Sequence, residues 1–181
     1  MGSTLFWMGR FADARTWLPS CAELGWILAL LGEPDAALAL PEDAPLHFYR
    51  DAAAACLRCL PPPGEATALD DLLRYWAHSR LGQRGDEAAA QRALATLRRN
   101  APCDAARGLA IHAIAAFHQH PAYALPHLDH ALDQFARFGL HHLEARLLEY
   151  KAQALDAGGQ LGEANRFLKA AAQARRRKVS Q

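Results

Sequence analysis

Apolar residues recur at intervals of three and four positions along most of the chain, which is the spacing of one face of an α-helix. Proline and glycine interrupt this pattern, because proline cannot continue a helix and glycine ends many of them. The pattern predicts helices over residues 2–8, 11–18, 21–31, about 34–40 and 45–59. It predicts longer helices afterwards, over about residues 68–82, 86–99, 103–118, 121–138, 141–157 and 161–177.

Several of these predicted helices carry capping signals at their ends. Thr67 is followed three residues later by Asp70, which resembles a capping box with Asp in the place of Glu. Pro102 and Pro121 stand at first-turn positions, where the missing N–H group costs least. Gly139 stands where a helix commonly ends on a left-handed glycine.

The composition supports an all-α fold. The chain of 181 residues contains 40 Ala and 28 Leu, but only 1 Val, 3 Ile and 4 Thr. The best helix formers therefore dominate, and the β-branched residues that favour strands are almost absent. This excludes folds built on a sizeable sheet, including Rossmann folds, TIM barrels and β-sandwiches. An apolar fraction of 51% is ample for a continuous core.

The predicted helices come in pairs whose small and large apolar residues repeat. The last pair shows the pattern most clearly, with a glycine turn at Gly158–Gly159 between two apolar stripes. The stripes consist of Leu148, Ala152 and Leu155 on the first helix, and Ala164, Leu168 and Ala171 on the second. Successive small anchors, Ala90, Ala124 and Ala164, are 34 and 40 residues apart. Small residues at these positions let two helices approach closely.

This arrangement resembles the tetratricopeptide-repeat family. The interval of 40 residues is similar to that of the degenerate helical repeats in MalT-like regulators. The resemblance implies a right-handed α-solenoid of stacked antiparallel helix pairs, because one pair cannot bury both of its faces alone. Residues 1–60 are then expected to form N-terminal degenerate repeats, 61–66 a proline-rich break, and 67–181 the tetratricopeptide-like repeats of one continuous solenoid.

The resemblance also implies a function, namely binding of a peptide or protein partner in a concave groove. In such repeats the first helix of each pair lines the groove, so the polar positions of first helices are the candidate binding residues. They are Asp71, Arg74 and His78 on one first helix, and Arg146, Glu149, Gln153 and Asp156 on another. The competing interpretation is that these residues only form a solvated face, as charged residues usually do.

The expected protein is therefore a non-enzymatic interaction module without a cofactor. The alternative is a sensor or regulatory segment of a MalT-like transcription regulator. The sequence leaves open the partner's identity, homo-oligomerisation, and whether the chain is a fragment of a larger regulator. A formal net charge of +1 argues against direct nucleic-acid binding. No secretory signal or membrane span is visible in the sequence, so a cytoplasmic location is expected.

Two groups of residues could carry other chemistry, but neither completes a motif. Seven of the nine histidines lie between His112 and His142, and His127 and His130 are three residues apart on one predicted helix. That spacing suits a metal pair, yet no third ligand is evident, so no metal site is assigned. Cys56 and Cys59 form a C-x-x-C motif at the end of a helix rather than after a strand, which favours incidental cysteines.

Overall fold

The computed structural model describes residues 52–139 and 141–179, and every regular element in these ranges is helical. In chain order the elements are α4 (Ala52–Cys59), α5 (Ala68–Arg80), α6 (Glu87–Asn100), α7 (Pro102–Gln119), the 3₁₀ helix η3 (Pro121–Ala124), α8 (Leu125–Phe138), α9 (His141–Ala157) and α10 (Leu161–Val179). The all-α class predicted from composition is confirmed for these residues. The helices predicted before residue 52 lie outside the described ranges.

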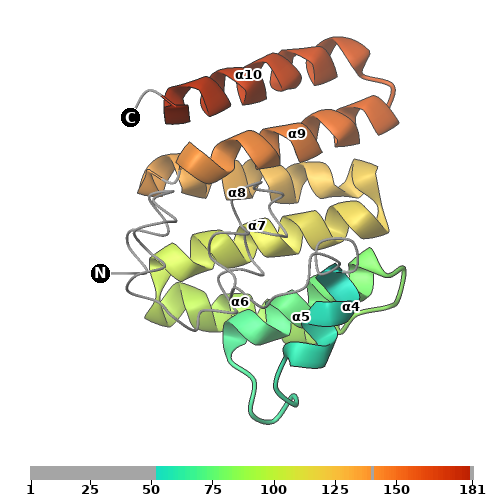
Figure 1. Ribbon diagram of the computed structural model, residues 1–181, viewed down its shortest axis with the longest axis vertical. Helices are drawn as coiled ribbons and strands as arrows, with labels where there is room; N and C mark the ends of the chain where they lie inside the picture. The colour runs from blue at the N-terminus through green and yellow to red at the C-terminus, as the bar shows by residue number, and fades with distance from the viewer. Residues whose placement is uncertain (1–51, 140, 180–181) are drawn as a thin grey trace.

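The helices pack mainly against their neighbours in the chain. From α4 to α10, every helix contacts the one that follows it, and α7 also contacts both α5 and α9. Figure 1 shows α7, α8, α9 and α10 lying side by side, with α10 at one end of the stack. The contacts thus define a layered array in which α7 touches α5 and α9 as well as the helices next to it in the chain.

The ends of α5 and α9 follow their local sequence signals. The Thr67 hydroxyl accepts a hydrogen bond from the Asp70 backbone N–H at 3.2 Å, and the Asp70 carboxylate accepts one from the Thr67 N–H at 2.8 Å. This reciprocal pair confirms the predicted capping box. Helix α9 is closed by Gly159, whose φ of +77° lets the Gln160 N–H reach the Leu155 carbonyl at 2.9 Å.

The region predicted as one helix over residues 121–138 is divided in two. A 3₁₀ turn, Pro121–Ala124, precedes α8, which begins at Leu125. Pro126 explains the division: it has no N–H to donate, and its ring would clash with the carbonyl four residues earlier in a continuous α-helix. At the other end Gly139 adopts a φ of +67° and closes α8, as the sequence predicts.

The core is built from alanines at close helix contacts and larger residues beside them. Among the described residues, the largest fully buried side chains come from helices α5, α7, α8 and α9, and are Phe135, Leu72, Leu73, Ile111, Ile114, Leu128 and Leu147. At Gly108 of α7 a β-carbon would lie 2.9 Å from Leu72 Cδ1, 3.0 Å from Leu97 Cδ1 and 3.1 Å from Leu94 Cδ2. Helices α5 and α6 therefore close on α7 at a point where a β-carbon would force leucine methyl groups to shift.

The last helix pair follows the predicted register in part. Ala152, Leu155 and Ala164 form a small buried cluster between α9 and α10. Leu168, expected in the buried stripe, is 47% exposed, so that assignment was wrong. Phe167 packs against the cluster instead. The reason is positional: within the described residues no helix follows α10, so its outer side is uncovered.

Candidate functional site

Two of the three candidates on α5, Arg74 and His78, are engaged close to their own positions in the chain. An Nη of Arg74 donates to the carbonyl oxygen of Pro61, in the connection between α4 and α5, and the Nε of Arg74 is buried with no hydrogen-bond partner among the described residues. His78 Nδ1 lies 2.8 Å from the side-chain oxygen of Gln83, just past the end of the helix. Asp71 is half-buried one turn before Arg74. Arg74 thus links α5 to the connection before it, and His78 links α5 to the connection after it.

The four candidates on α9 form one stripe along the helix. At its N-terminal part, Arg146 Nη1 donates to Glu149 Oε2 at 2.8 Å. The other oxygen of Glu149 lies 2.5 Å from Arg175 Nη2 of α10, so one carboxylate bridges two guanidinium groups. Further along, Gln153 and Asp156 are exposed. The α9 stripe therefore passes from a half-buried ion network to open solvent, and α7 lies between it and α5.

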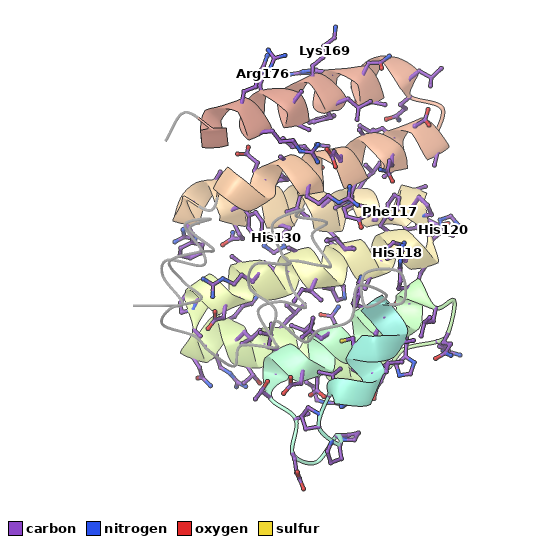
Figure 2. All side chains as sticks on the ribbon, in the orientation of Figure 1. Phe117, His118, His120, His130, Lys169 and Arg176 are labelled. Carbon is purple, nitrogen blue, oxygen red and sulfur yellow. The ribbon has the colours of Figure 1, made fainter. Side chains whose placement is uncertain are left out.

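An aromatic cluster that the sequence did not indicate connects this stripe to α7. The Tyr150 ring of α9 meets the Phe117 and His118 rings of α7 edge-on, with centroids 5.0 and 5.9 Å away. The guanidinium carbon of Arg146 lies 4.8 Å from the Tyr150 ring centroid, within the range of a cation–π contact. Figure 2 labels Phe117 and His118 on this part of α7. Arg146 is thus oriented by a carboxylate and an aromatic ring together.

The electrostatics of this cluster depend on its burial. Burial, followed by the charges of Arg80 and Arg146, lowers the pKa of His118 to about 4. His118 is therefore neutral near pH 7 and adds no positive charge. Burial by itself would lower the pKa of Arg146, but its hydrogen bond to Glu149 and the neighbouring Tyr150 raise that pKa overall. The cluster formed by Arg146, Arg175 and Glu149 carries two positive charges for one negative charge.

A second histidine, His112 of α7, occupies the interior where four helices meet. The residue is 3% exposed, and its ring stacks on Tyr75 of α5 with centroids 5.5 Å apart and meets the edge of His127 of α8 at 5.1 Å. Gln91 of α6 places its amide nitrogen 3.2 Å from His112 Nε2. Since that amide nitrogen only donates, His112 Nε2 accepts, and the ring is neutral. Burial, then His127 and Arg98, lowers the pKa of His112 to about 4.

The histidine-rich region does not converge on a metal site in the described part of the chain. His127 faces His112, whereas His130 lines a separate cleft between α6 and α8. Across residues 52–139 and 141–179, no group of three or more His, Cys, Asp or Glu side chains could hold a metal ion. Cys56 is fully buried in the core, and the Cys59 side chain lies outside the described set.

Comparison with known proteins does not assign the chain to a family. No protein-family model, curated protein or solved structure matches it. The similarity to tetratricopeptide and MalT-like repeats therefore stays a prediction from the residues. None of the described helices is both long and apolar enough to cross a membrane.

Proposed function

We propose that the chain is a non-enzymatic, tetratricopeptide-like helical-repeat module that binds a peptide or protein partner in a groove over α5, α7 and α9. The packing of both α5 and α9 against α7 supports this proposal, because three alternate helices then share one side of the array. A stack of helix pairs has such a side as an extended surface, which suits an extended or helical segment of a partner.

The observation that carries the proposal is the environment of Arg146. Its side chain is 29% exposed, is fixed by Glu149 and Tyr150, and keeps its Nε buried with no hydrogen-bond partner in the described part of the chain. A guanidinium group held in this way loses little conformational freedom on binding. With Arg175 beside it, the site has a surplus positive charge that favours a partner carboxylate through charge-assisted hydrogen bonds.

The neighbouring aromatic residues suit the same role. Phe117 and His118 are partly exposed and supply rigid aromatic area next to the charged group, while the buried Tyr150 ring supports them from behind. Aromatic residues and arginine are enriched among the few residues that dominate binding energy at interfaces. His118 is neutral near pH 7, so it does not repel a basic neighbour of the partner's acidic residue. We therefore expect a preference for segments that combine an acidic residue with an apolar one.

A displayed library of random peptides, selected on the intact chain, tests this function. The parent protein should enrich peptides that contain Asp or Glu next to an apolar residue, and Arg146→Glu should abolish that enrichment because it introduces repulsion. The matched control is Lys169→Glu, since Lys169 is exposed on α10 and points outward in Figure 2. Arg146→Gln removes the charge without adding repulsion, and thermal melts establish that each variant is folded.

Two outcomes would contradict the proposal. One is a selection on the folded parent that yields no acidic consensus. The other is a folded Arg146→Gln variant that binds the selected peptides as tightly as the parent and the Lys169→Glu control do.

A further inference from the structure

A cleft of about 270 Å³ opens between α6 and α8, over the N-terminal half of α7. Leu109 of α7 contributes to its floor and Arg98 of α6 to one wall. The opposite wall belongs to α8, where the lining residues are His130, Gln134, Arg137 and Phe138. These four residues are spaced by four, three and one positions, so they occupy one face of the helix. The α8 wall is thus a continuous stripe, and His130 marks it in Figure 2.

The polar part of the cleft has one sign of charge. Arg98 and Arg137 line it from two helices that are separate in the chain, and neither forms an ion pair with a described residue. Within the described ranges no carboxylate lines the cleft. Asp104, in the first turn of α7, is already paired with Arg107. The cleft therefore holds two permanent cations for which the described side chains provide no counter-charge.

The remaining lining residues add apolar surface and a hydrogen-bonding group. Leu109 is only 8% exposed, so it presents a small apolar floor. The Phe138 ring lies 5.9 Å from the Arg137 guanidinium carbon, which keeps this cation beside an aromatic wall. Gln134 lies one turn before Phe138 and provides an amide that can donate to an anion. Charge and apolar surface thus occur within one small volume.

We infer that this cleft is a binding site for a small organic carboxylate with an apolar body. The carboxylate is held by Arg98 and Arg137, whose guanidinium groups match it in shape and charge. The apolar body lies against Leu109 and Phe138. Because the volume is near the lower limit of ligand pockets, about 300–1,000 Å³, the ligand is a small one. The site lies between α6 and α8, so it is separate from the proposed groove over α5, α7 and α9.

Titration of the ¹⁵N-labelled intact chain with benzoate, followed by amide chemical shifts at constant ionic strength, tests this inference. Benzoate should produce saturable shifts in the residues of α6, α7 and α8 that line the cleft. Benzamide keeps the ring but lacks the charge, and inorganic phosphate has the charge without an apolar body. Both should bind at least about tenfold more weakly than benzoate.

Substitutions in the cleft give the second half of the test. Arg137→Gln and Arg98→Gln should each weaken benzoate binding about tenfold, because each removes a charge-assisted contact. Arg92→Gln is the matched control, since Arg92 is exposed on α6 outside the cleft, and it should leave the affinity unchanged. The far-ultraviolet circular dichroism spectrum establishes that each variant is folded.

Several results would overturn the inference. They are benzoate shifts that do not saturate or that map outside the cleft, phosphate or benzamide binding as tight as benzoate, and folded Arg137→Gln and Arg98→Gln variants with unchanged affinity.

Discussion

The close approach of three helices at Gly108 gives the sharpest test of the packing. Alanine in the interior of a helix is favoured over glycine by about 1 kcal/mol, so Gly108→Ala gains that amount from propensity. Its methyl group, however, would lie 2.9 to 3.1 Å from three leucine methyl groups. Leu97 is only half-buried and can move, but Leu72 is fully buried. Overpacking of this kind costs about 1–3 kcal/mol, so we expect a net loss of about 1 kcal/mol.

Gly162 of α10 provides the matched control, because nothing lies within 4 Å of a β-carbon at that position. Gly162→Ala should therefore raise the free energy of unfolding by up to about 1 kcal/mol. Urea denaturation of both variants and the parent measures the two effects, with m-values checked for equality. The two substitutions should have opposite signs. A Gly108→Ala variant at least as stable as the parent would refute the close packing of α5, α6 and α7.

Three further predictions concern a cap, a helix contact and a buried histidine. Thr67→Ala should lower the free energy of unfolding by about 1 kcal/mol, whereas Thr67→Ser should not, because the hydroxyl completes the capping box. Equal urea midpoints for Thr67→Ala and Thr67→Ser would contradict this. Ala164→Leu should cost ~1–3 kcal/mol, since Ala164 is 5% exposed. Gln173→Leu, exposed on the same helix, should change stability by less than about 0.5 kcal/mol, and similar urea midpoints for these two variants would mean that the α9–α10 register is wrong. His112 has a pKa of about 4 in the folded chain, against 6.5 ordinarily. Its neutral ring therefore contributes fully to the free energy of unfolding above pH 6.5, and up to about 3 kcal/mol of that free energy is lost as the pH falls towards 4. Unfolding of His112→Gln should depend less on pH over that interval than unfolding of the parent, and identical profiles would exclude His112 as a cause.

The sequence predicted those features that depend on residues close together in the chain. The two residues of the capping box, Thr67 and Asp70, are three positions apart, and Gly139 ends α8 through its own backbone conformation. Both signals act within one helical turn, so no knowledge of the tertiary structure is needed. The division of the predicted helix at Pro126 also has a local cause, because the proline ring excludes a continuous α-helix through the preceding turn, whereas apolar periodicity continues across it.

Features that depend on the register between helices could not be predicted in the same way. The His112 site combines side chains from α5, α6, α7 and α8, and Arg98 and Arg137 meet at one cleft although they are far apart in the chain. Leu168 fits the apolar stripe of α10 but lies on the side that the described helices do not cover. Helical periodicity identifies a face, whereas only the packed structure shows what that face meets.

The contact of Glu149 with Arg175, in the proposed groove, also depends on the register between helices and could not be predicted from the sequence. The sequence places Glu149 among the polar positions of a first helix, but the partner of one of its oxygens comes from the following helix. Likewise, the engagement of Arg74 with the Pro61 carbonyl depends on how the α4–α5 connection folds back. These contacts make Arg146 a more informative position for charge reversal than Arg74, which also supports the local fold.

The most direct test of the proposed function is to map the surface that a selected acidic peptide covers. Amide hydrogen exchange of the intact chain, with and without the peptide, gives this map at the level of single helices. We expect protection on α5, α7 and α9, strongest around Phe117, His118 and Arg146, and its loss in Arg146→Gln. Protection confined to α6, α8 or α10, or no protection at saturating peptide, would contradict it.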